Sequence, residues 1–109
     1  MSDCLWIHYA RPRPHWYGLD AAAQAGQRAR WQAAAAASAA EGGVCVGTWH
    51  VRGQHDFETV ALWRFPDPDA VFRHWARLTE AGYAAFNAFA NNIGLPAEAT
   101  AGAPAEATE

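Results

Sequence analysis

Two histidines lie where an imidazole could transfer protons. His8 falls in the run CLWIHYAR, residues 4–11, and His74 falls in the run VFRHWARL, residues 71–78. An unperturbed imidazole titrates near physiological pH, so it can act as a general acid or base. A histidine on an apolar face is more often a hydrogen-bonded core residue, and that alternative stays open for both. We treat His8 and His74 as the candidate catalytic groups.

Four of the six tryptophans, together with one asparagine, are candidates for contact with a small molecule. Indole rings offer flat, polarisable walls and N–H donors, which suit an aromatic or polycyclic ligand. A buried unpaired amide is costly, so an asparagine in an apolar segment needs a partner. The alternative is that the tryptophans only fill space beside an alanine-rich helix. The candidate ligand-binding residues are Trp6, Trp49, Trp63, Trp75 and Asn87.

Other chemistries have no motif to carry them. The histidines lack the H-x-x-x-H, H-E-x-x-H and H-x-H spacings of zinc sites, so we expect no metal. Cys4 and Cys45 do not form a C-x-x-C pair and are expected to be buried free thiols. No nucleophile elbow, phosphate loop or dinucleotide fingerprint is present. Asn91 or Asn92 is expected to cap a helix before Gly94.

Composition indicates an ordered globular protein. The chain has 109 residues, of which 51% are hydrophobic and 17% charged, which suits one domain with one core. Its formal net charge of −3 argues against a nucleic-acid or anionic-membrane surface. No segment reaches the roughly 20 apolar residues of a membrane span, and we expect a cytoplasmic protein. Residues 1–95 are expected to form the domain and residues 96–109 a disordered tail.

The order of predicted elements is β-α-β-β-α, with a possible last strand. Strand-like runs cover residues 4–11, 44–51 and 57–65. A first helix is expected from Asp20 to about Ala40, and a second starts at Asp67-Pro68, since Asp is a good N-cap and Pro fits the first helical turn. Residues 83–93 could be helix or strand. This order is typical of an α+β fold of the ferredoxin-like half-barrel type.

Alternation along the strands predicts a sheet with two apolar faces. In the first strand, Leu5, Ile7 and Tyr9 share one face, and Trp6 and His8 share the other. Helices can cover only one face, so a second copy of the sheet is the natural cover for the other, and we expect a homodimer. We expect the Trp-bearing face to lie under the helices, with Trp6, His8, Trp49 and Trp63 on it.

Over residues 4–95 the sequence resembles the dimeric α+β barrel superfamily, and especially its short bacterial members of unknown function. The resemblance is carried by the loop around Pro14-His15-Trp16, by LWRFPDPDA at residues 62–70 and by AGYAAFNAFANNIG at residues 81–94. It implies pairing of two subunits sheet to sheet and a ligand cavity between sheet and helices.

Three hypotheses about function follow. The first is a cofactor-independent enzyme, a monooxygenase, isomerase or cyclase acting on an aromatic or polyketide-like metabolite with His8 or His74 moving a proton. The second comes from the resemblance, because several branches of the superfamily hold haem with a helix histidine as axial ligand, a role that would fall to His74. The third is a non-catalytic ligand-binding or structural dimer, in which packing satisfies every histidine.

Overall fold

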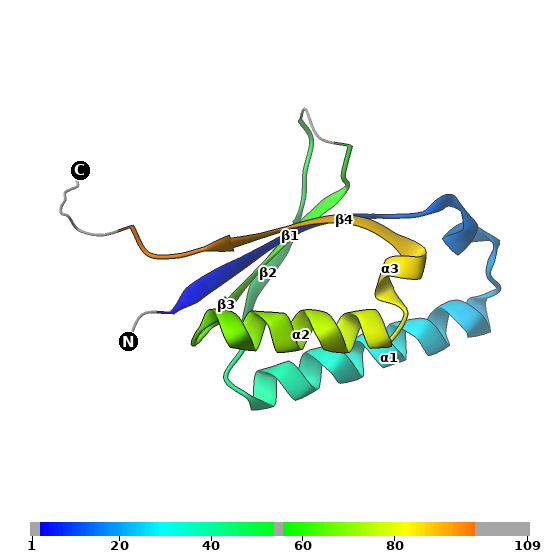
Figure 1. Cartoon of the computed structure of the whole chain (residues 1–109). Helices are drawn as coiled ribbons and strands as arrows, with labels where there is room; N and C mark the ends of the chain where they lie inside the picture. The colour runs from blue at the N-terminus through cyan, green and yellow to red at the C-terminus, as the bar shows by residue number, and fades with distance from the viewer. Residues whose placement is uncertain (1–2, 54–55, 98–109) are drawn as a thin grey trace.

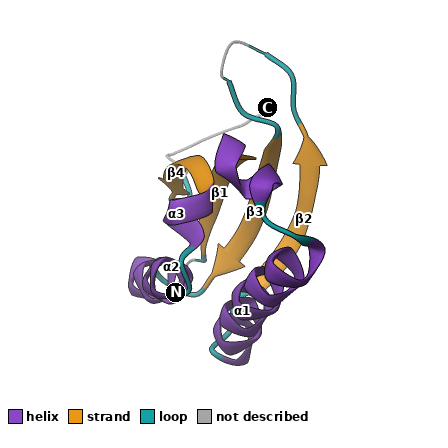
Figure 2. Cartoon of the chain, turned by 90° about the vertical axis from the view of Figure 1, so that its right-hand side faces the viewer, coloured by secondary structure: helices purple, strands orange, loops and turns teal. Residues whose placement is uncertain are grey.

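The computed structural model describes residues 3–53 and 56–97 and confirms the ferredoxin-like α+β fold. Four antiparallel strands form one sheet in the order β2-β3-β1-β4. Both long helices lie on one face of this sheet, α2 on the β4 side and α1 on the β2 side (Figures 1 and 2). The elements in chain order are β1 (Cys4–Pro12), the 3₁₀ helix η1 (Pro14–Gly18), α1 (Ala21–Ala40), β2 (Val44–His50), β3 (Thr59–Phe65), α2 (Pro68–Glu80), α3 (Tyr83–Phe86) and β4 (Asn87–Gly94).

Both long helices begin at the predicted caps. The Asp20 carboxylate accepts a hydrogen bond from the backbone N–H of Ala23 at 2.8 Å, and the Asp67 carboxylate accepts one from that of Ala70 at 2.9 Å. Each bond satisfies a donor that the first helical turn leaves without a partner. Just after α1, Gly42 has a φ of 101°, a left-handed conformation that favours glycine and turns the chain toward β2.

The segment from residue 83 to residue 93 is both helix and strand. Gly82 has a φ of 84° and separates α2 from the single-turn α3, after which the chain becomes extended as β4. The expectation that Asn91 or Asn92 caps a helix is therefore wrong, because both lie in β4 beside β1. Hydrogen bonding to β1 determines the extended conformation of β4, because the helical preference of a short segment is weaker than its pairing in a sheet.

The predicted position of Trp49 is also wrong. The register of β2 against β3 shifts between Cys45 and Gly47, where a bulge inserts one extra residue. Beyond a bulge the alternation of faces is reversed. Trp49 therefore pairs with Val60 on the face away from the helices, and it is 48% exposed.

The helices leave β2 uncovered. Every residue of β2 except the half-buried Gly47 is exposed, and this includes Cys45. The expectation of two buried thiols holds for Cys4, which lies in the core beside β3, and fails for Cys45. β2 lies at the edge of the sheet, where the helices cover it least.

The core fills the space between the sheet and the two helices. Its buried members from the strands include Cys4, Trp6, Trp63 and Phe65, and those from α2 include Val71 and Leu78. Within the described part of the chain, no helix has the length and apolar character needed to cross a membrane. Most of the expected disordered tail, residues 98–109, lies outside the described residues. His55 lies outside them as well.

Candidate active site

The helix-covered face of the sheet brings both candidate histidines together with Trp6. The rings of Trp6 and His8 stack with centroids 4.6 Å apart and an interplanar angle of 20°. On its other side Trp6 meets His74 edge to face at 4.8 Å, and His74 also lies 4.7 Å from Trp63. His8 and His74 are only 5% and 2% exposed. The predicted face is therefore correct for Trp6, His8 and Trp63.

Both ring nitrogens of His8 have side-chain partners. Nδ1 lies 2.6 Å from Oδ1 of Asn91, and Nε2 lies 2.7 Å from the hydroxyl of Tyr83. An amide oxygen can only accept, so Nδ1 carries the ring proton and donates it to Asn91. Nε2 then accepts from the Tyr83 hydroxyl. We call this arrangement the Tyr83–His8–Asn91 chain.

Burial sets the protonation state of the Tyr83–His8–Asn91 chain. It lowers the pKa of His8 below its ordinary value, although the hydrogen bond to Asn91 acts in the opposite direction. Burial also raises the pKa of Tyr83. At neutral pH the histidine is therefore neutral and the tyrosine keeps its proton. The Tyr83 hydroxyl donates to Nε2 of His8, and burial keeps both groups in their uncharged forms.

His74 belongs to a different network. Its Nδ1 lies 2.6 Å from Oγ of Ser38, which is 1% exposed in α1. The guanidinium of Arg77 donates to the same Oγ at 2.9 Å and pairs with the carboxylate of Glu41 at 2.6 Å. Because Arg77 donates to Oγ, the Ser38 hydroxyl points its hydrogen at Nδ1 of His74. This network joins α1 to α2.

The surroundings of His74 keep it neutral. Burial, the positive charge of Arg77 and then the proximity of His8 lower the pKa of His74 to about 4. A neutral imidazole that accepts at Nδ1 carries its proton on Nε2. His74 therefore holds the two helices together. Its hydrogen-bond partner is Ser38, whereas the partners of His8 are Asn91 and Tyr83, so the two histidines belong to separate networks.

Trp75 and Asn87 have definite places. Trp75 packs its ring near those of His8 and Tyr83, with centroids 5.7 and 5.9 Å apart, so it is part of the predicted cluster. Asn87 is buried and donates its amide to the carbonyl oxygen of Tyr83 at 3.2 Å, which braces α3. Asn91, which sequence reasoning assigned to a helix cap, contacts the histidine instead.

Three residues that hydrogen-bond directly to the two histidines were not predicted as site residues. Tyr83, Asn91 and Ser38 come from segments whose fold had to be known first. For Asn91 the signal was present in part: an amide in an apolar segment needs a partner, and strand pairing places it opposite His8. Ser38 is a small polar residue inside an alanine-rich helix, a pattern that also fits a solvent-facing position.

Large apolar side chains of α2 and β4 lie beside the Tyr83–His8–Asn91 chain. Trp75 and Phe89 are half-buried and pack with centroids 4.5 Å apart. One turn before Trp75, Phe72 is 61% exposed, and Ile93 on the helix-facing side of β4 is 36% exposed. We call Phe72, Trp75, Phe89 and Ile93 the aromatic edge. Exposed apolar groups beside a polar residue are typical of a place where a small molecule binds.

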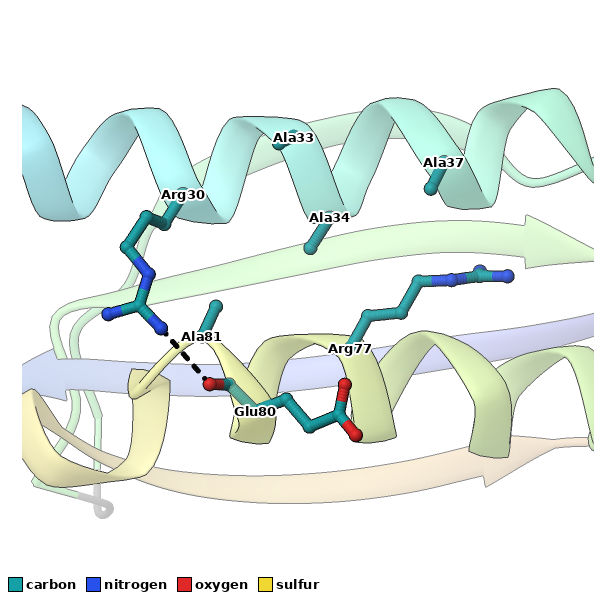
Figure 3. Close-up of a pocket in the computed structure, with 7 residues that line it drawn as sticks. All are labelled: Arg30, Ala33, Ala34, Ala37, Arg77, Glu80 and Ala81. Atoms are coloured by element: carbon teal, nitrogen blue, oxygen red, sulfur yellow. Dashed lines mark hydrogen bonds between the residues drawn. The ribbon is translucent and has the colours of Figure 1, made fainter.

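Two hollows in the described structure lie away from His8 and His74. A groove of about 460 Å³ runs between α1 and α2, lined by two arginines, Glu80 and four alanines, and Arg30 crosses it to donate to the carbonyl oxygen of Glu80 (Figure 3). A second, of about 430 Å³, lies at the β2–β3 connection. The candidate histidines line neither one. Among the described residues, no three His, Cys, Asp or Glu side chains are grouped so that they could hold a metal ion.

Solved structures share this fold at low sequence identity. A chlorite dismutase variant from Candidatus Nitrospira defluvii has a TM-score of 0.73 at 13% identity, over 86% of this chain and 40% of its own. A haem-binding protein from Thermus thermophilus has a TM-score of 0.69 at 15% identity, over 86% and 40%. SnoaB, a cofactor-independent oxygenase from Streptomyces nogalater, has a TM-score of 0.52 at 14% identity, over 90% and 96%.

These likenesses show that this chain shares the fold of these proteins. The chain spans less than half the length of chlorite dismutase and nearly the whole length of SnoaB. No protein-family model matches the sequence, and a comparison with curated proteins finds no match.

The buried, neutral state of His74 predicts a loss of stability in acid. The pKa of His74 is about 4 in the folded chain and 6.5 when unperturbed, so protons bind the unfolded chain more readily. The stabilisation is complete above about pH 6.5 and is lost as the pH falls toward 4, by roughly 3 kcal/mol in the free energy of unfolding. Urea titrations at a series of pH values will measure this.

The matched variants are His74→Gln and His50→Gln, the second at an exposed position of β2. We expect His74→Gln to weaken the pH dependence, leaving the part that the buried His8 contributes, and His50→Gln to leave it unchanged. A His74→Gln protein that loses stability between pH 6.5 and 4 as steeply as the parent would contradict the assignment.

Proposed function

We propose that this protein is a cofactor-independent enzyme that removes a proton from an aromatic small molecule at the Tyr83–His8–Asn91 chain. The observation that carries the proposal is the unbroken hydrogen-bonded path from a phenol through a neutral imidazole to an amide oxygen, with steps of 2.7 and 2.6 Å. Buried titratable groups that hydrogen-bond to one another and have shifted pKa values are found preferentially at functional sites, which supports a proton-transfer role.

The hydrogen bonds define how the proton moves. A substrate proton passes to the hydroxyl oxygen of Tyr83 as the tyrosine's own proton moves to Nε2 of His8. The imidazolium formed is stabilised by Oδ1 of Asn91, which accepts from Nδ1–H, and by the face of Trp6 stacked on it. Asn91 also fixes the tautomer, because it can accept but not donate at that atom.

The aromatic edge supports an aromatic substrate. A planar molecule resting on Trp75 and Phe89 would lie against rings whose centroids are 5.7 and 6.3 Å from that of the His8 imidazole. Offset stacking of this kind adds affinity beyond the area that it buries. Phe72 and Ile93 extend the apolar surface outward, so the substrate class is a flat polycyclic molecule with a carbonyl-activated C–H.

The comparison with SnoaB supports the same reaction class. That protein is a cofactor-independent oxygenase, and this chain covers 96% of its length. Deprotonation of an activated C–H gives a carbanion that dioxygen can oxidise without a bound cofactor, and the same deprotonation begins an isomerisation or cyclisation. Proton removal is therefore the step common to all three reactions.

Anthrone, a tricyclic ketone with an activated methylene, tests this step. Under argon in D₂O, we expect the protein to accelerate deuterium exchange at the methylene, measured by proton NMR, and His8→Gln to lose about 10²-fold or more of that rate. Admitting air then separates an oxygenase, which consumes dioxygen and yields anthraquinone and water, from an isomerase or cyclase.

His50→Gln serves as the control and should exchange deuterium at the parent rate. Exchange no faster than in buffer, or an equal rate in His8→Gln, would rule out the proposed role of the Tyr83–His8–Asn91 chain with this substrate class.

We also propose that the protein is a homodimer that pairs through the uncovered face of the sheet. The centre of this face is apolar, where Ile7 and Leu62 pair and Trp49 lies opposite Val60. Leu5 and Val44, 37% and 50% exposed, lie toward one end beside the exposed Arg64. Exposed apolar side chains on a sheet face are unfavourable in water, and a second copy of the same sheet is their simplest cover.

Charge substitutions on the two faces test the dimer. Leu62→Glu places a charge at the centre of the uncovered face, whereas Ala36→Glu places one on the exposed side of α1. Light scattering at micromolar concentration should give twice the chain mass for the parent and for Ala36→Glu, and the chain mass for Leu62→Glu. A monomeric parent would contradict the pairing.

The histidines under the helices do not fit a haem, the group that a neighbouring structure binds. An axial ligand needs a free nitrogen lone pair facing open space. Nδ1 of His74 accepts from Ser38, its ring is 2% exposed among Trp6 and Trp63, and both nitrogens of His8 are hydrogen-bonded. Haem therefore has no part in the proposed reaction.

Adding hemin checks this disagreement directly. We expect no shift of the Soret band in the presence of the protein, because binding would require the Ser38–His74 bond to break and the core to open. A shift that disappears in His74→Ala would overturn this conclusion.

A further inference from the structure

A row of oxidisable rings runs through the molecule. Successive centroids are 5.3, 5.3, 5.9 and 6.3 Å apart, so each ring is in contact or nearly in contact with the next. The rings belong to η1, α1, α3, α2 and β1, and they bring together segments far apart in the sequence. In order they are Trp16, Trp31, Tyr83, Trp75 and Trp6.

Within this row, Tyr83 is the ring with a base on its ionisable proton. Its hydroxyl lies 2.7 Å from Nε2 of the neutral His8. A phenol that loses one electron becomes a strong acid, so its proton leaves at once if an acceptor is in place. The product is a neutral tyrosyl radical, and the positive charge left by the lost electron lies on the imidazolium of His8, which Oδ1 of Asn91 stabilises.

The rings toward η1 lack this arrangement. Trp31 donates its indole N–H to the carbonyl oxygen of Ala81 at 3.2 Å, and a carbonyl oxygen is too weak a base to take that proton. The guanidinium of Arg28 lies 5.3 Å over the ring of Trp16, where a positive charge opposes loss of an electron. Among Trp16, Trp31 and Tyr83, an oxidising equivalent is therefore held best at Tyr83.

We propose that Tyr83 is a redox-active tyrosine that gives up one electron while its phenolic proton moves to His8, with the tryptophan row conducting the oxidising equivalent to it. The oxidant is a small one-electron acceptor such as an organic peroxyl radical. The acceptor gains the electron and becomes a peroxide anion that is protonated by water. The O–H bond of Tyr83 breaks and an N–H bond forms on His8, whose other proton stays on Nδ1 facing Asn91.

This role needs no substrate at the aromatic edge, so it can be tested apart from the proposed reaction. The sequence has three tyrosines, and the double variant Tyr9→Phe/Tyr17→Phe leaves Tyr83 as the remaining one. Photogenerated ruthenium(III) tris-bipyridine serves as the oxidant. Electron paramagnetic resonance of protein made with ring-deuterated tyrosine then distinguishes a tyrosyl from a tryptophanyl radical.

We expect a tyrosyl signal in the double variant and its loss when Tyr83→Phe is added. A signal from tryptophan alone in the double variant would overturn the proposal, whether or not anthrone exchanges deuterium.

The role of His8 has its own readout. In the double variant we expect the radical to form more slowly in D₂O than in H₂O, because a proton moves with the electron. Adding His8→Gln should remove the tyrosyl signal, since an amide cannot take the proton. An equal rate in the two solvents, or an undiminished tyrosyl signal in a folded His8→Gln protein, would contradict proton transfer to His8.

Discussion

The hydrogen-bonding needs of one buried imidazole govern this site. His8 has two ring nitrogens, it is 5% exposed, and a buried polar atom without a partner costs about 1–3 kcal/mol. Asn91 can reach one nitrogen only because β4 runs antiparallel to β1 with Asn91 opposite His8. Tyr83 can reach the other only because Gly82 turns the chain into α3 after α2. The last third of the described chain thus completes the site begun by the first strand.

The second histidine shows how differently the same side chain can be used a few ångströms away. His74 shares Trp6 with His8, yet its partners are Ser38 and, through it, Arg77. These groups join two helices and leave no lone pair facing open space. The bond to Ser38 and the packing against Trp6 and Trp63 occupy His74 on every described side. The two imidazoles contact the same indole and belong to separate hydrogen-bonded networks.

Local signals in the sequence were enough for much of the fold. Asp20 and Asp67 begin the helices that they were expected to begin, and alternation in β1 places Trp6 and His8 under those helices. Trp49 was misplaced because a bulge reverses alternation, and nothing in the run VCVGTWH distinguishes a bulge from a regular strand. Asn91 and Tyr83 could not be assigned to His8 because strand pairing over more than 70 residues decides their positions. Long-range pairing, rather than residue type, was the missing information.

The direct test of the Tyr83–His8–Asn91 chain is the tautomer of His8. Long-range ¹H–¹⁵N correlation spectra, assigned by comparison with His8→Gln, report which ring nitrogen carries the proton at pH 7. The structure predicts a neutral ring with the proton on Nδ1, donated to Asn91, and a bare Nε2 facing the hydroxyl of Tyr83. A proton on Nε2, or on both nitrogens, would contradict the direction of proton flow on which the proposed chemistry depends.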